Sequence, residues 1–217
     1  MPGAHSRRRL PRVSSPVRAR PASPADVERW LAELDLSPIQ RIDHEGATSW
    51  DLDLDGRRRF DLRTTLILDP AVGLICWAHL APPIGDGLRK AYRTLLRWND
   101  EYPFAKFSVA EDGRPILAAE LAAARLDQDE VGLALSRLIG IADQLLDETA
   151  PWLWIGGRIP ERYKDRVGRN EALIARYSDR LPELFGTPAE PATPADPTEP
   201  TDPTEPTEPA EPAEPAE

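Results

Sequence analysis

The chain has 217 residues, and its 37 acidic and 27 basic side chains give a formal net charge of −10 at pH 7. A single cysteine, Cys76, excludes an intramolecular disulfide and indicates a reducing compartment. No window approaches the roughly twenty apolar residues that a membrane-spanning helix needs, so we expect a cytoplasmic protein with no membrane contact.

The first 23 residues contain arginine but no acidic side chain. We expect residues 1–23 to form a disordered, solvated arm. Its Arg7, Arg8 and Arg9 could instead bind nucleic-acid phosphates or anionic lipid. The acidic C-terminal end would compete for the same arginines, so nucleic acid is the weaker alternative.

Ser23-Pro24 predicts the start of the first helix. Serine is a favoured N-cap, and proline suits the first turn because its missing N–H is not needed there. Apolar side chains then recur at helical spacing. They are Val27, Trp30, Leu31 and Leu34. Ser37-Pro38 ends this helix.

The period then changes from 3.6 to 2, which indicates strands. Trp50, Leu52 and Leu54 alternate with aspartates, and Asp55-Gly56 predicts a two-residue hairpin turn. The alternation continues on a return strand over residues 60–68. A third strand follows over 74–80 and ends before two prolines, so the three strands predict an antiparallel meander with one buried face.

The aspartates of this region match the opening of a calcium-binding loop over residues 51–56. Such a loop requires a bidentate acid at its twelfth position, and Leu62 stands there. The strand-like alternation also contradicts a helix–loop–helix. We therefore interpret the aspartates as a solvated strand face, and we predict neither a metal site nor a cofactor.

A second helix is predicted from Asp86 to Tyr102 and ends at Pro103. A second hairpin, with strands over 104–109 and 116–121, turns at Asp112-Gly113. Asp127 then caps a third helix. The order of helix, three strands, helix, two strands and helix predicts an α+β fold with a five-stranded antiparallel sheet and helices packed on it.

Two further segments follow the predicted 24–150 domain. Residues 151–186 form a tryptophan-containing extension with a weak helical pattern over about 160–180, in which Gly168 would cost about 1 kcal/mol relative to alanine. Residues 187–217 alternate proline, acidic and small residues without a large apolar side chain. We expect a disordered, solubilising tail, although its proline spacing also suits a polyproline II docking peptide.

Trp98-Asn99 and Tyr102-Pro103-Phe104 resemble the helix-to-strand junction of the YbjN family. The likeness extends over about residues 24–148, including the second hairpin and the helix from Asp127. Members are described as bacterial sensory transduction regulators with a fold similar to type III secretion chaperones. The resemblance implies an α+β domain without enzymatic activity that self-associates and engages other proteins, and it supplies no catalytic residue.

Five aromatic side chains are our candidates for protein binding. They are Trp98, Tyr102, Phe104, Trp152 and Trp154. The first three could equally be core residues, and the last two could clasp the sheet of their own chain.

The sequence contains no Ser-His-Asp set, phosphate loop or dinucleotide motif, and we interpret Cys76 as a buried structural residue. We therefore predict a non-enzymatic, protein-binding regulator or chaperone-like module. Its partner would be a protein, either a different chain or a second copy in a homodimer. The alternative is a nucleic-acid-associated regulator that uses the N-terminal arm.

Overall fold

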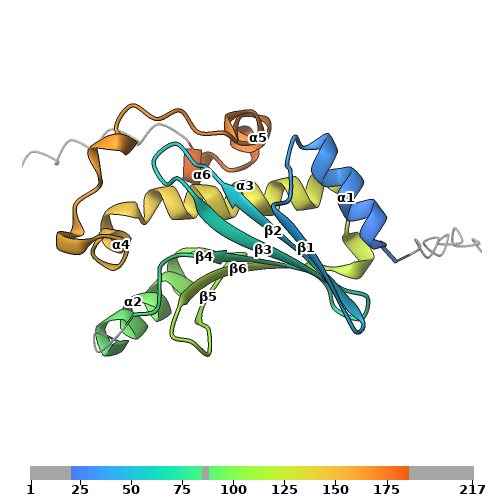
Figure 1. Ribbon diagram of the computed structural model, residues 1–217, viewed down its shortest axis with the longest axis horizontal. Helices are drawn as coiled ribbons and strands as arrows, with labels where there is room; N and C mark the ends of the chain where they lie inside the picture. The colour runs from blue at the N-terminus through green and yellow to red at the C-terminus, as the bar shows by residue number, and fades with distance from the viewer. Residues whose placement is uncertain (1–20, 85–87, 186–217) are drawn as a thin grey trace, which may run out of the picture. The chain divides into compact units, whose positions relative to one another are not determined.

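The computed structural model describes residues 21–84 and 88–185, which all belong to one compact unit (Figure 1). Most of the predicted arm, including Arg7, Arg8 and Arg9, lies outside the described residues. The same holds for the predicted helix cap at Asp86 and for the predicted tail over 187–217.

A six-stranded antiparallel sheet forms the centre of the fold, in the order β1-β2-β3-β4-β6-β5. Its strands are β1 (Gln40–His44), β2 (Ala47–Leu54), β3 (Leu62–Asp69), β4 (Gly73–His79), β5 (Lys106–Val109) and β6 (Pro115–Ala122). The predicted α+β class and antiparallel sheet are confirmed. The predicted number of five strands was one too few.

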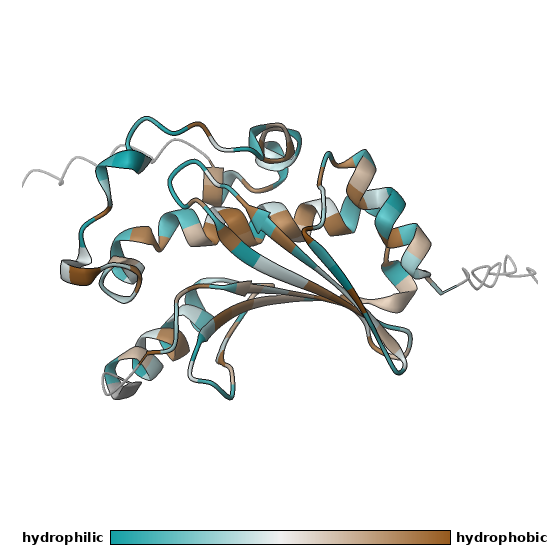
Figure 2. Cartoon of the chain, in the orientation of Figure 1, coloured by the Kyte–Doolittle hydropathy of each residue, from teal (hydrophilic) through white to brown (hydrophobic). Residues whose placement is uncertain are grey.

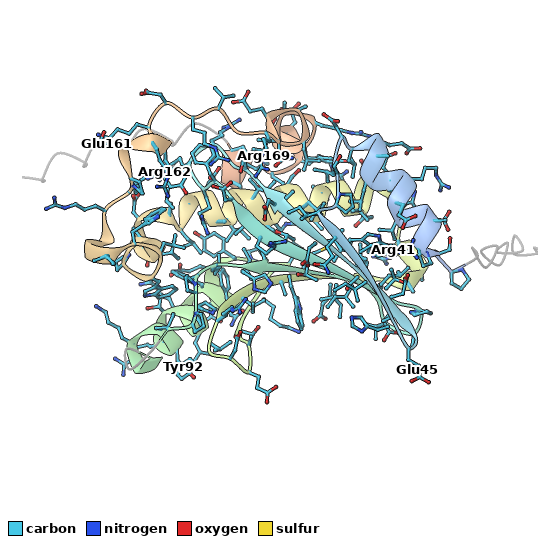
Figure 3. The ribbon with its side chains drawn as sticks, in the orientation of Figure 1. Arg41, Glu45, Tyr92, Glu161, Arg162 and Arg169 are labelled. Carbon is cyan, nitrogen blue, oxygen red and sulfur yellow. The ribbon has the colours of Figure 1, made fainter. Side chains whose placement is uncertain are left out.

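The missing strand is β1, at the edge of the sheet. All five of its residues are exposed, so it lacks the alternation of buried and exposed side chains that identifies a strand in a sequence. It pairs with β2 across a turn at Gly46, whose φ of 86° suits glycine. Arg41 of β1 reaches Glu28 at 2.5 Å, which ties this edge to the first helix (Figure 3).

The helices are α1 (Pro24–Glu33), α2 (Leu88–Glu101), α3 (Gln128–Gln144), α4 (Leu146–Leu153), α5 (Glu171–Tyr177) and α6 (Pro182–Phe185), with short 3-10 turns between some of them. The longest, α3, packs on β4 and β6, while α1, α4, α5 and α6 pack on α3, and α2 packs on β5. In Figure 2 hydrophobic residues recur along α3 and the central strands. The core lies between them.

The predicted caps of two helices are confirmed. The Ser23 hydroxyl accepts a hydrogen bond from the Asp26 N–H at 3.3 Å, and the Asp26 carboxylate accepts one from the Ser23 N–H at 2.9 Å. This is a capping box. At α3 the Asp127 side chain accepts from the Glu130 N–H at 2.9 Å. Both helix starts therefore follow from local sequence.

The predicted two-residue turn at Asp55-Gly56 was wrong. β2 ends at Leu54 and β3 begins at Leu62, so residues 55–61 form a longer loop, which we call the 55–61 loop. Asp55 is fully buried and hydrogen-bonds to residues far along the chain. A tight hairpin turn would instead leave its side chain in solvent. Phe60, predicted on the return strand, is a buried loop residue.

The predicted helix over 160–180 is only partly correct. A 3-10 turn covers Glu161–Tyr163 and α5 covers Glu171–Tyr177, with Gly168 between them. A Cβ atom on Gly168 would lie 2.4 Å from the Gly56 carbonyl oxygen, so this glycine allows two backbone segments to touch.

We expect Gly168→Ala to lower the free energy of unfolding by about 1–3 kcal/mol, because the added methyl group must push the two segments apart. A glycine inside a helix would give the opposite sign, a gain of about 1 kcal/mol. Urea unfolding followed by tryptophan fluorescence measures the difference, with Val167→Ala at the exposed neighbour as the control. An unchanged or higher stability of Gly168→Ala would contradict the close approach of Gly168 to the Gly56 carbonyl oxygen.

Candidate protein-binding surface

The three candidate tryptophans contact other parts of the same chain. Trp98 is fully buried in the core, and its ring lies 5.6 Å from that of the half-buried Trp152 on α4. Trp154 lies 5.7 Å from Tyr163, which stacks on Phe60 of the 55–61 loop. Trp98 therefore presents no surface to a partner. The ring contacts of Trp152 and Trp154 are intramolecular, but they join α2 and the Glu161–Tyr163 turn and not the sheet of the predicted clasp.

The segment after α4 is fixed to the 55–61 loop by ionic hydrogen bonds to Asp55. The Asp55 carboxylate accepts from Arg169 Nε at 2.8 Å and from Arg166 Nη2 at 3.0 Å (Figure 3 labels Arg169). Asp61 pairs with Arg166 at 2.8 Å. Asn170 accepts from the Asp55 N–H at 2.7 Å. We call these five residues the Asp55 cluster.

The Asp55 cluster shifts the acidity of its central carboxyl. Burial alone would raise the pKa of Asp55, but hydrogen bonds from Arg169 and from the Asp61 and Arg169 main chain outweigh it and lower the pKa to about 2. Asp55 is therefore ionised and paired throughout the physiological range, as expected for a structural ion cluster.

Asp143 of α3 fixes the same loop from the other side. Its carboxylate accepts the main-chain N–H groups of Arg57, Arg58 and Arg59 at 2.7, 2.9 and 2.6 Å. Its neighbour Gly56 is so close that a Cβ there would meet the Asp143 side chain at 2.3 Å. Both buried carboxylates therefore hold the fold together and do not form a site open to a ligand.

The residues that follow α2 form a different, exposed surface. Phe104 is 80% exposed and has a φ of 62°, and the Arg137 guanidinium of α3 lies 5.2 Å from the centre of its ring. Tyr102 is half-buried beside Phe107, and Pro103 is exposed. We call Tyr102, Pro103, Phe104 and Arg137 the Phe104 surface.

The position of the Phe104 surface is fixed by Asn99 of α2. Its amide oxygen accepts the Phe107 N–H at 2.7 Å, and its amide nitrogen donates to the Phe107 carbonyl oxygen at 3.1 Å. Both hydrogen bonds join Asn99 to Phe107 of β5, so helix and strand are held together on either side of Phe104.

Two hollows adjoin the Phe104 surface. One, of about 280 Å³, is lined by Tyr102, Pro103 and Arg137 together with residues of α3 and α6. The other, of about 390 Å³, lies between β6 and α3 and is lined by Phe104, Arg125 and Arg137, among others. Neither arginine forms an ion pair with any residue in 21–84 or 88–185. Burial lowers the pKa of Arg137, although it stays protonated. The surface therefore combines an exposed ring, two hollows and two arginines without an ion pair, although Glu130 and Glu183 lie in the linings with Arg137.

In the sheet, Cys76 and the aspartates that resemble calcium ligands are buried or ion-paired. Cys76 is fully buried, and burial raises the pKa of its thiol to about 12, which disfavours the nucleophilic thiolate. Asp51 and Asp53, from the calcium-like stretch, face Arg63 at 3.5 and 3.4 Å. Within the described ranges no group of three or more His, Cys, Asp or Glu side chains is placed to hold a metal ion. In those ranges, too, every helix is too short or too polar to cross a bilayer.

The sequence pointed to Tyr102 and Phe104 but not to Arg125 and Arg137. These arginines stand 21 and 33 residues after Phe104 in positions typical of solvated helix and turn residues. Only the packing of α3 against the sheet brings them together with the ring, so no local signal identifies them.

Residues 23–150 match the model of the YbjN family, described as "Putative bacterial sensory transduction regulator". The match includes the whole sheet, α1 to α3 and the Phe104 surface, and it ends before Arg166 and Arg169 of the Asp55 cluster. No curated protein matches the chain.

Proposed function

The chain belongs to the YbjN family, and on that premise we propose that it is a non-enzymatic regulator that acts in the cytoplasm by binding another protein. The family description supplies the regulatory role. The exposed Phe104 ring and the two hollows beside it support a surface for a partner. The single buried cysteine supports a reducing compartment.

The observation that carries this proposal is the exposure of Phe104 in a costly backbone conformation. A left-handed residue other than glycine costs about 1–2 kcal/mol. Glycine would avoid this cost, and a polar side chain would avoid exposing an aromatic ring. Such strain concentrates at functional positions, and aromatic residues and arginine are enriched at protein interfaces.

The alternative function, nucleic-acid association, rests on Arg7, Arg8 and Arg9, which lie outside the described residues. Arg125 and Arg137 could attract phosphate, but Glu120 and Glu130 line the same hollow. A protein partner with both apolar and charged groups is therefore the better complement to this surface. A second copy of the chain is one form that this partner can take.

Site-specific photo-crosslinking in the native host tests the proposal. A photoreactive phenylalanine analogue is placed at position 104, and at Val72 as a control, since Val72 is 54% exposed in the turn between β3 and β4. We expect position 104 to give a discrete protein adduct that position 72 does not give. An adduct to the same chain would identify the partner as a second copy. Equal labelling from both positions, or none from position 104, would contradict protein binding through this surface.

A further inference from the structure

β6 continues beyond the end of its neighbour β5. β5 pairs with β6 from Val109 opposite Pro115 to Lys106 opposite Ala118. On its other side β6 pairs with β4 as far as Ala122, which lies opposite Gly73. Residues 119–122 therefore have a strand on one side only, among the residues that the structure describes.

The direction of the main-chain groups along β6 follows from the hydrogen bonds at its start. The Arg114 carbonyl accepts from Ala110 on the β5 side at 2.8 Å, and the Pro115 carbonyl accepts from Leu80 on the β4 side at 3.0 Å. Successive residues of a strand point their N–H and C=O groups to opposite sides. The main-chain N–H and C=O groups of the even-numbered residues of β6 therefore point to the β5 side.

Gly73 confirms this alternation at the far end of the strand. A Cβ atom there would lie 2.0 Å from the Leu121 carbonyl oxygen and 2.7 Å from the Ala123 nitrogen, so these odd-numbered groups face β4. Glu120 and Ala122 consequently direct their N–H and C=O groups to the side where β5 has ended. Such an edge is a template for another strand.

The 390 Å³ hollow lies directly beside this edge, and we call edge and hollow together the β6 groove. Leu121 of β6, Leu133 of α3 and the Phe104 ring give it an apolar lining. Arg125 and Arg137 lie in the same lining without an ion pair. Of the two glutamates there, Glu120 is already paired with Lys106 at 2.7 Å, and Glu130 is the one acidic side chain left to offset the two arginines. The groove thus offers hydrogen-bonding main chain, an apolar hollow and a small excess of positive charge.

We propose that the β6 groove binds an extended, acidic peptide segment of the partner protein as an added strand. The segment pairs with the main chain of Glu120 and Ala122, inserts an apolar side chain beside Leu121 and Leu133, and directs a carboxylate to Arg125 or Arg137. Main-chain pairing supplies affinity in this mode of recognition, and pockets for alternate side chains supply specificity. This inference rests on the proposed function and names the kind of segment recognised.

A helix or a nucleic acid matches this groove less well. A helix has its main-chain groups bonded internally and cannot pair with a strand edge. A nucleic acid would meet the arginines, but it offers no regular ladder of main-chain partners to Glu120 and Ala122. The combination of an unpaired edge with two arginines that make no ion pair therefore favours an extended peptide that carries carboxylates.

Ala122→Pro tests the main-chain pairing without disturbing the fold. Ala122 is exposed with a φ of −63°, which proline adopts, and the N–H that proline removes is the one directed away from β4. A fluorescent peptide of alternating valine and glutamate is titrated into the full-length chain by anisotropy. We expect Ala122→Pro to weaken binding about tenfold, and Arg137→Gln to weaken it similarly, with the thermal midpoint of each protein unchanged.

Two matched peptides complete the test. Replacing the glutamates with lysines is expected to abolish binding. N-methylation of every second residue is expected to weaken binding when the methylated amides face β6, and not when they face away from it. The inference is overturned if wild type does not bind the acidic peptide, if Ala122→Pro binds it equally, or if an oligonucleotide binds the groove more tightly.

The crosslinking experiment separates this inference from the proposed function. A position-104 adduct that persists at wild-type yield in the Ala122→Pro chain would keep the protein-binding role and reject strand addition. Absence of any adduct in the parent chain would reject the protein-binding role itself. We expect an adduct in the parent chain and a strongly reduced yield with Ala122→Pro.

Discussion

Replacing Asp143 with alanine is expected to lower the free energy of unfolding by about 3–5 kcal/mol, because it leaves three N–H donors of the 55–61 loop without an acceptor. These donors belong to Arg57, Arg58 and Arg59, and all three bond the one carboxylate. Asp143 is only 7% exposed, so water cannot readily take its place. The loss is a large part of the stability of a typical domain.

Urea unfolding at neutral pH, followed by tryptophan fluorescence, measures this loss. Asp147→Ala is the matched control, since Asp147 also pairs with the same loop, through the Arg58 side chain at 2.8 Å, but does so in solvent. An exposed ion pair of this kind contributes less than about 1 kcal/mol. Equal, small losses in the two variants would show that Asp143 does not hold the loop.

The Asp55 cluster is expected to make stability depend on pH in the acid range. The pKa of Asp55 is about 2 in the folded chain, against an ordinary value of 3.8 for a solvated aspartate. Because the folded pKa is the lower one, the stabilisation is complete above about pH 4 and is lost as pH falls through 2. Its size is about 2 kcal/mol.

Comparison with Asp55→Asn isolates this contribution from the other carboxyl groups. At pH 5 the variant should be less stable than the parent by about 2 kcal/mol or more, and the difference should shrink as pH approaches 2. Urea unfolding at pH 5, 3 and 2 gives the three differences. A difference that stays constant over this range would contradict a lowered pKa of Asp55.

Much of the fold follows from local sequence. The capping residues Ser23 and Asp127 mark real helix starts, and the alternation around Trp50 and Leu66 marks real strands. β1 could not be found in this way, since it buries no side chain. The 55–61 loop could not be found either, because its partners Asp143 and Arg169 lie 84 to 114 residues away in the chain.

The candidate surface was only partly predictable, for a similar reason. Tyr102 and Phe104 stand out as aromatic residues around a helix-ending proline, but the sequence does not reveal that Phe104 is exposed and Trp98 buried. The open end of β6 depends on where β5 stops, and strand ends carry weak sequence signals. Arg137 meets Phe104 only through the packing of α3.

The most direct test of the protein-binding role is to remove the Phe104 ring while preserving the fold. Phe104→Gly relieves the left-handed strain at φ 62°, so we expect the thermal midpoint to stay the same or to rise. The tagged full-length chain is recovered from its native host as the parent, as Phe104→Gly and as Val72→Ser. A partner recovered with the parent and Val72→Ser, but about tenfold less with Phe104→Gly, is the predicted result. Equal recovery with all three proteins, at equal stability, would contradict it.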